Sequence, residues 1–142
     1  MGLCTINTDA SFLPDSKRGG WAFWITCDEY VLKSYGGFKE SAINVQHAEG
    51  AAVCNAIHSI IKRGVKFDKV IINCDNLTVV HAINDRTFST KVPSSIVLAG
   101  LLHQLGCPVE ARHVRAHSHT LTARNYVNSW CDQYSRKYLF EK

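Results

Sequence analysis

The chain has 142 residues, of which 46% are hydrophobic and 20% are charged, with 16 Lys and Arg against 12 Asp and Glu and six cysteines. This length and balance predict one domain over residues 1–142 and exclude a disordered tail or a collagen-like repeat. The formal net charge of +4 is compatible with a polyanionic partner but does not identify one.

No segment has the pattern of a membrane span or a secretion signal. Apolar runs stay below the ~18 residues that a span requires, and the N-terminus lacks a basic segment followed by an apolar one. We therefore expect an intracellular protein, in the cytoplasm or in a eukaryotic nucleus, without membrane contact. The six cysteines form no C-x-x-C pair and are predicted to be reduced, mostly buried thiols rather than zinc ligands.

The N-terminal third predicts three strands. Residues 3–9 alternate and predict a strand ending at Asp9, followed by a turn-like loop over residues 14–20. Residues 21–27 and 30–35 are rich in aromatic and β-branched side chains, which predicts an antiparallel hairpin.

The rest of the chain mixes helical and strand periods. The predicted elements are a helix over 45–61, a strand over 70–74, helices over 77–83 and 96–105, a strand over 109–114 and a final helix carrying an apolar stripe from Val127 to Tyr138. The order β-β-β-α-β-α-α-β-α predicts an α/β fold, with a mixed sheet and helices on both of its faces.

Three acidic residues occupy positions where a solvent-exposed surface charge is not expected. Asp9 ends the first strand, Glu49 lies beside the apolar stripe of its helix, and Asp75 follows a buried strand. Taken singly, each could have a purely structural role, as a turn acid, a helix-flank residue paired with Lys, and a helix N-cap respectively. Together, they converge if the first strand pairs with the later parallel strand. Converging carboxylates need a cation, and oxygen ligands favour Mg²⁺ or Mn²⁺ over zinc.

Four short segments surround these acids and a histidine. They are Thr8-Asp9-Ala10-Ser11, Gln46-His47-Ala48-Glu49-Gly50-Ala51-Ala52, Cys74-Asp75-Asn76 and His113-Val114-Arg115-Ala116-His117. In this order they resemble the motifs of the type 1 ribonuclease H family, whose fold is shared by the ribonuclease H domain of reverse transcriptases. The resemblance runs from Leu3 to about Tyr138 and implies a five-stranded mixed sheet in the order 3-2-1-4-5.

The resemblance implies a metal-dependent endonuclease that hydrolyses the RNA strand of RNA/DNA hybrids and leaves 5′-phosphate ends. It implies two Mg²⁺ ions, replaceable by Mn²⁺ and about 4 Å apart, and no obligate small-molecule cofactor. By resemblance Asp9 bridges the ions, Glu49 and Asp75 complete one site, and His117 assists proton transfer or product release.

Substrate contacts are expected around the same motifs. The family resemblance implies contacts to the RNA strand near Ala10, Ser11, Gln46 and Asn76. Arg115 and Arg124 flank the proposed site and are the candidates for phosphate contacts.

The final helix departs from the family pattern, Asn-Glu-x-Val-Asp-x-Leu-Ala, whose aspartate is the fourth metal ligand. The best register places Asn128 at that aspartate, which predicts retained folding and substrate binding but reduced turnover. Three interpretations stay open. Asn128 is an inactivating substitution, it is natural in a nuclease-derived binding module, or Asp132, one helical turn later, supplies the carboxylate.

Two other functions compete with the ribonuclease. One is a catalytically silent module that binds hybrids or duplexes, and the other is a related DNA nuclease on the same fold. The connection over residues 84–94 carries only Arg86 and Lys91, so the basic helix of long family members is absent. Modest hybrid affinity is therefore expected, for a monomer or for part of a larger replication or reverse-transcription system.

Overall fold

The computed structural model describes residues 2–13, 15–27, 31–38, 44–64, 66–89, 92–114 and 123–140, with side chains in the last stretch described at 127 and 130–137. The elements are β1 (Leu3–Leu13), β2 (Arg18–Thr26), β3 (Val31–Gly37), α1 (Val45–Lys62), β4 (Lys69–Cys74), α2 (Leu77–Asp85), α3 (Pro93–Leu105), β5 (Val109–His113) and α4 (Ala123–Phe140). Each predicted strand and helix is present in the predicted order.

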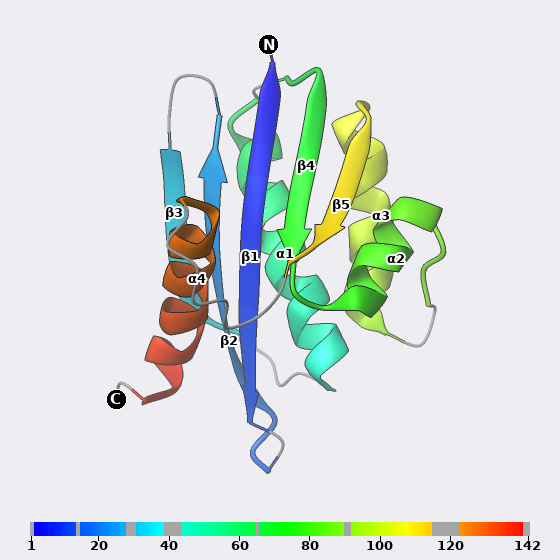
Figure 1. The fold of residues 1–142 in the computed structure, drawn as a ribbon. Coiled ribbons are helices and arrows are strands. Elements are labelled where there is room, and N and C mark those ends of the chain that lie inside the picture. The colour runs from blue at the N-terminus through cyan, green and yellow to red at the C-terminus, as the bar shows by residue number, and fades with distance from the viewer. Residues whose placement is uncertain are drawn as a thin grey trace.

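The five strands form one mixed sheet in the order β3-β2-β1-β4-β5 (Figure 1). The pairs β1–β2 and β2–β3 are antiparallel, whereas β1–β4 and β4–β5 are parallel. This confirms both the predicted fold class and the order 3-2-1-4-5. The central strand β1 therefore has an antiparallel neighbour on one side and a parallel neighbour on the other.

Helices cover both faces of the sheet, as predicted. Helix α4 packs on β1, β2 and β3 at the front of Figure 1, and α1 packs on β1 and β2 from behind. Helix α3 packs on α1, and α2 packs against β5. The main core lies between the sheet and α1, where Ile6, Ile25, Ile57 and Ile72 are fully buried. No helix among the described residues combines the length and apolarity needed to cross a bilayer.

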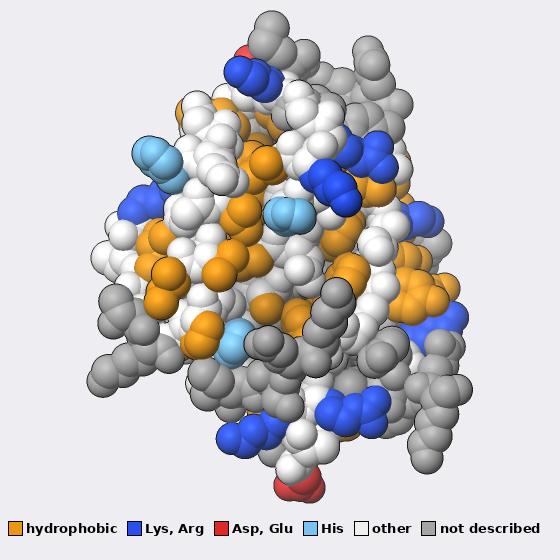
Figure 2. Space-filling view, turned by 180° about the vertical axis from the view of Figure 1, so that it is seen from behind, with side chains coloured by type: hydrophobic (Ala, Val, Ile, Leu, Met, Phe, Trp, Pro, Cys, Tyr) orange, Lys and Arg blue, Asp and Glu red, His pale blue; other side chains and the backbone are white. Residues whose placement is uncertain are grey.

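The side covered by α1 and α3 faces the viewer in Figure 2. Hydrophobic side chains gather in its middle with Lys and Arg around them, and Asp and Glu are drawn only near the two ends. Ile96 and Val97 of α3 are more than half exposed. Five of the six cysteines are buried and all six are free, which agrees with the predicted reduced thiols.

Two sequence-based boundaries are wrong. β1 continues past Asp9 to Leu13, and β2 already begins at Arg18, so the predicted loop over residues 14–20 shrinks to a short turn. Asp9 consequently lies inside a long strand, opposite Ala22, and not at a strand end. The glycines that suggested a loop have another role, because they lie where other parts of the chain come very close.

Gly20 is the tightest of these contacts. A Cβ atom added to Gly20 would lie 2.0 Å from the backbone carbonyl oxygen of Ser135 in α4. The helix therefore rests directly on the backbone of β2 at this point. Any side chain at position 20 would displace α4 from the sheet.

We predict that Gly20→Ala lowers the free energy of unfolding by about 3 kcal/mol, because a backbone oxygen cannot rotate away from the added methyl group. The matched control is Gly100→Ala in α3, where an added Cβ meets nothing within 4 Å. This control should gain up to about 1 kcal/mol from helix propensity. Urea unfolding of both variants measures the difference, and equal stabilities would contradict the close packing of α4.

Candidate metal centre

Asp9 is held in the middle of the central strand, on the side that faces α4. The residue is 7% exposed, and one oxygen of its carboxyl accepts the N–H of Ala10 at 2.9 Å. Ser11, two residues along and therefore on the same face of β1, has its hydroxyl 2.9 Å from that of Ser135 in α4. The strand alternation thus points the Asp9 carboxyl towards the helix and away from bulk water.

Glu49 reaches the same place from the opposite face of the sheet. It lies in the second turn of α1 and is 5% exposed, and its Oε1 accepts the N–H of Ala10 at 3.1 Å. The other oxygen, Oε2, lies 3.9 Å from the thiol of Cys74, which donates to it. The described partners of Glu49 are therefore the Ala10 amide, the Cys74 thiol and the Asp75 side chain, and none of them is the lysine of the alternative interpretation.

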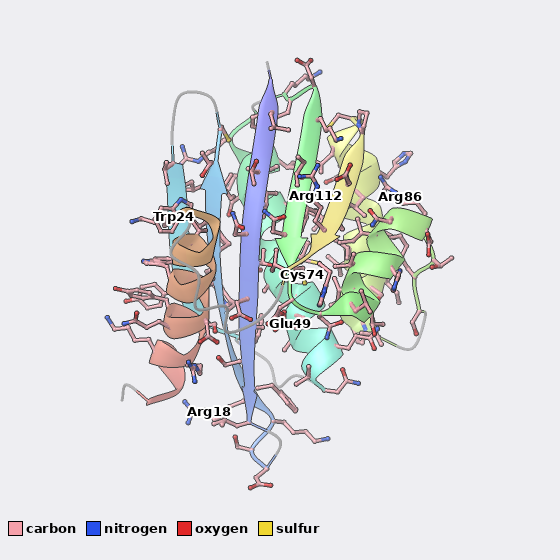
Figure 3. The ribbon with its side chains drawn as sticks, viewed as in Figure 1. Arg18, Trp24, Glu49, Cys74, Arg86 and Arg112 are labelled. Carbon is pink, nitrogen blue, oxygen red and sulfur yellow. The ribbon has the colours of Figure 1, made fainter. Side chains whose placement is uncertain are left out.

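Asp75 joins them at the carboxyl end of β4. The N-cap of α2 is Asn76, whose side chain accepts the N–H of Val79 at 3.0 Å, so the alternative role of Asp75 as N-cap is wrong. Ligand atoms of Glu49, Cys74 and Asp75 all lie within 4.8 Å of one another. Glu49 and Cys74 lie side by side near the end of β4 in Figure 3.

Burial and mutual repulsion raise the proton affinity of this cluster. The pKa of Asp9 rises from 3.8 to about 8, first because of burial and then because of the charges of Asp75 and Asp132. The pKa of Glu49 rises well above its usual value for the same reasons, with Asp9 and Asp75 as the charged neighbours. The Ala10 N–H opposes both rises. A bound cation would neutralise the negative charges and restore ionisation.

Cys74 is part of the cluster, although the sequence pattern predicts it only as a buried thiol. It is fully buried, and its pKa rises well above the ordinary value because of burial and then the charge of Glu49. The thiol therefore stays protonated and acts as a hydrogen-bond donor. Its position directly before Asp75, at the last residue of a buried strand, is the sequence signal for this role.

Asp132 contributes a fourth carboxylate from α4. Its charge and a hydrogen bond between the two side chains raise the pKa of Asp9, so Asp132 lies beside Asp9. It also accepts a hydrogen bond from Arg136 at 2.6 Å, one turn along the helix. Its neighbour Cys131 donates to the carbonyl oxygen of Asn7 at 3.6 Å. Contacts on both sides of the helix turn thus hold Asp132 over β1.

This position corresponds to a different register of the final helix. If the family pattern is shifted by one turn, its Asn falls on Asn128, its Asp on Asp132 and its small Ala on Ser135. The small residue Ser135 is the sequence signal that could have indicated this register, and the structure buries it against Gly20. Asn128 itself lies on α4, but its side chain is outside the described residues.

The other predicted site residues have mixed positions. The side chains of Ser11 and Asn76 already bond within the chain, to Ser135 and to the first turn of α2, and Gln46 is half-buried in the first turn of α1. The Ala10 N–H bonds the two carboxylates. His117 and Arg115 lie outside the described residues, and the side chain of Arg124 does as well. Their predicted substrate and proton-transfer roles stay predictions.

We predict that the metal-free protein loses stability as the pH rises from about 4 to about 8. In the unfolded chain Asp9 ionises near its ordinary pKa of 3.8, whereas the folded chain holds the proton to about 8. Unfolding in this range releases protons, so the free energy of unfolding falls with pH. Urea unfolding in EDTA at several pH values measures the slope, and Mg²⁺ should restore stability at the upper end.

Asp9→Asn should raise the melting temperature in EDTA near pH 8 and flatten this pH dependence, because the amide removes one of the repelling charges. Asp15→Asn, in an exposed turn, is the control and should leave both unchanged. A large loss of stability in Asp9→Asn would instead make Asp9 a structural residue.

Solved structures with the same fold come from archaea, bacteria and viruses. Ribonuclease H1 from the halophilic archaeon Halobacterium salinarum NRC-1 is 14% identical with a TM-score of 0.71, covering 97% of this chain and 98% of that one. The N-terminal ribonuclease H domain of a Mycobacterium tuberculosis protein, fused to maltose-binding protein, is 13% identical with a TM-score of 0.74, covering 96% and 93%.

The third similar structure is the protease-reverse transcriptase of prototype foamy virus. It is 15% identical with a TM-score of 0.70, and the match covers 99% of this chain but 21% of the viral one. These identities establish the fold alone. No curated protein sequence matches the chain. The sequence profile described as reverse transcriptase-like matches residues 7–100, which is more than half of the chain, and the chain therefore belongs to the reverse transcriptase-like family and has the ribonuclease H fold.

Proposed function

We propose that the chain is a divalent-metal-dependent endonuclease that hydrolyses the RNA strand of RNA/DNA hybrids. The observation that carries the proposal is the meeting of carboxylates from β1, α1, the end of β4 and α4, of which Asp9 and Glu49 are almost completely buried. Such a cluster costs folding free energy without a cation, and a purely structural role does not account for it. The ribonuclease H fold and the family membership support the same activity.

The donor set fits Mg²⁺, or Mn²⁺ as a substitute. Asp9, Glu49, Asp75 and Asp132 offer hard carboxylate oxygens, and the soft ligand beside them, Cys74, stays protonated because of its raised pKa. When bound, two such ions would supply an activated water and neutralise the leaving 3′-oxygen. Hydrolysis of a phosphodiester in this way leaves a 5′-phosphate and a 3′-hydroxyl.

The protein's own part is to position the ligands. The Ala10 N–H donates to both Asp9 and Glu49 and fixes the gap between β1 and α1. Arg136 holds the Asp132 carboxylate from one side, and the Cys131 and Ser135 contacts fix its helix on β1. Asp132 therefore takes the role of the fourth carboxylate in this proposal, which makes the chain an active enzyme and not one impaired by Asn128.

The substrate is proposed from the family and the fold. The similar structures include ribonuclease H1 and a viral protease-reverse transcriptase, which favours an RNA/DNA hybrid as the partner. The match to the viral protein also favours a role for this chain as part of a larger reverse-transcription system. Two alternatives, the silent binding module and the DNA nuclease, predict different outcomes in one cleavage experiment.

We predict that the wild-type chain cleaves a labelled RNA/DNA hybrid in Mg²⁺ or Mn²⁺ and that Asp132→Asn lowers the rate about a hundredfold or more. The loss is expected because one ion loses a negatively charged ligand. Asn128→Asp should change the rate little. Asp85→Asn, an exposed carboxylate at the end of α2, is the matched control.

Each other outcome separates the alternatives. Equal rates for wild type and Asp132→Asn would remove Asp132 from the metal centre. Activity that appears only in Asn128→Asp would restore Asn128 as the ligand position. If no variant cleaves the hybrid but all still bind it, the result would favour the binding module. If an all-DNA duplex is cut as fast as the hybrid, the result would favour the DNA nuclease.

A further inference from the structure

An open cleft lies between the edge strand β3 and helix α4, on the far side of that helix from β1. Its lining residues are Lys33, Ser34, Tyr35, Trp130, Tyr134 and Lys137, and we call it the β3–α4 cleft. Its volume is about 460 Å³, which falls in the range of small-molecule sites and can hold a nucleobase with its sugar. None of these described lining residues is acidic.

Aromatic rings form a continuous ladder along this cleft. The rings of Trp130 and Tyr134 stack with centroids 4.5 Å apart. The ring of Tyr35 follows, with its centroid 4.8 Å from that of Tyr134 and its plane tilted by 53°. Trp24 of β2, labelled in Figure 3, closes the other end. Its ring lies 5.5 Å from that of Trp130, at an interplanar angle of 84°. Tyr35 is 38% exposed. The ladder is therefore a platform at the surface and not part of the buried core.

Two lysines bring positive charge to the ladder, one near each end. The Nζ atom of Lys33 lies 4.5 Å from the ring centroid of Trp24, and the Nζ of Lys137 lies 5.0 Å from that of Tyr134. Each Nζ atom lies over an aromatic face, an arrangement in which ring and charge attract each other. A ligand that matches this surface needs flat rings and negative charges.

The cleft and the metal centre share helix α4. Trp130, Tyr134 and Lys137 follow one another at helical spacing on the β3 side, while Cys131 and Ser135 contact β1. A helix with its side chains is only about 10–12 Å across. A strand leaving the metal centre thus reaches the cleft within a few nucleotides.

We propose that the β3–α4 cleft binds single-stranded nucleic acid, with a base stacked on the exposed ring of Tyr35 and phosphates paired with Lys33 and Lys137. Single strands combine exposed base faces with a regular row of phosphates, and their binding sites combine stacking rings with cations. A duplex hides its base faces and leaves the ring ladder unused. The binding itself needs no metal centre, and only the placement of a hybrid's single-stranded tail there rests on the proposed function.

The test measures binding of short fluorescein-labelled poly-dT and poly-U strands by fluorescence anisotropy in EDTA, where no cleavage occurs. Lys33→Gln with Lys137→Gln keeps the aliphatic stems and removes both charges, and should weaken binding about tenfold. The slope of log K against log salt should fall by about 1.4, because each phosphate contact to a single strand contributes about 0.7. Tyr35→Leu should weaken binding about tenfold with the salt slope unchanged.

The matched control is Lys66→Gln, an exposed lysine between α1 and β4 that should leave binding unchanged. Three results would overturn the proposal: no saturable binding by the wild type, an equal effect of Lys66→Gln, or unchanged binding by the double variant. Self-association in sedimentation that the double variant abolishes would assign the cleft to a second copy instead. Because the assay uses single strands in EDTA, its outcome is independent of whether the chain cleaves hybrids.

Discussion

The candidate metal centre depends above all on the parallel pairing of β1 with β4 in the middle of the sheet. The register aligns Leu3 with Lys69 and Asn7 with Asn73. Asp9 in β1 and Asp75, directly after β4, each lie two residues beyond the last aligned pair. A buried hydrogen bond from the Asn73 amide to the Asn7 side-chain oxygen, 3.1 Å long, fixes this register. A slip of one residue would turn Asp9 to the other face of the sheet.

The two helices then determine which carboxylates join the pair. Helix α1 brings Glu49 from the side of the main core, and α4 brings Asp132 from the opposite side. Each helix is anchored by hydrogen bonds to β1: the Ala10 N–H holds Glu49, and Ser11 and the Asn7 carbonyl hold α4. Packing free energy from both layers thereby offsets the repulsion among the acids.

Much of this arrangement could be predicted from the sequence because it follows local periodicity. The alternating strands, the helical stripes and the short buried run before Asp75 specify the elements, and the family resemblance supplies the sheet order. The positions of three acidic residues, on a strand, on a helix and directly after a strand, also predicted that their side chains converge. The structure brings Asp9, Glu49 and Asp75 together as that pattern predicts.

Contacts between distant segments were harder to predict. Gly19 and Gly20 have the composition of a turn, but they leave room for Phe38 and α4, which no local pattern encodes. Two registers of the final helix were open because Asn128 and Asp132 are one turn apart and both fit a helical stripe. The structure favours the second register, because Asp132 lies beside Asp9 and Ser135 is buried against Gly20. The contact of the Cys74 thiol with Glu49 likewise depends on how α1 packs on the sheet, which the position of Cys74 before Asp75 does not specify.

Because Gly20 has no side chain, the backbone of β2 itself limits how closely α4 can approach the sheet. Where most helices rest on a sheet through side chains that can change rotamer, α4 meets β2 backbone to backbone at Ser135. Such a contact is nearly incompressible, so the height of the helix above the sheet does not follow fluctuations of the surrounding side chains. The precision with which Asp132 is positioned over Asp9 therefore depends on Gly20, a residue that has no side chain of its own.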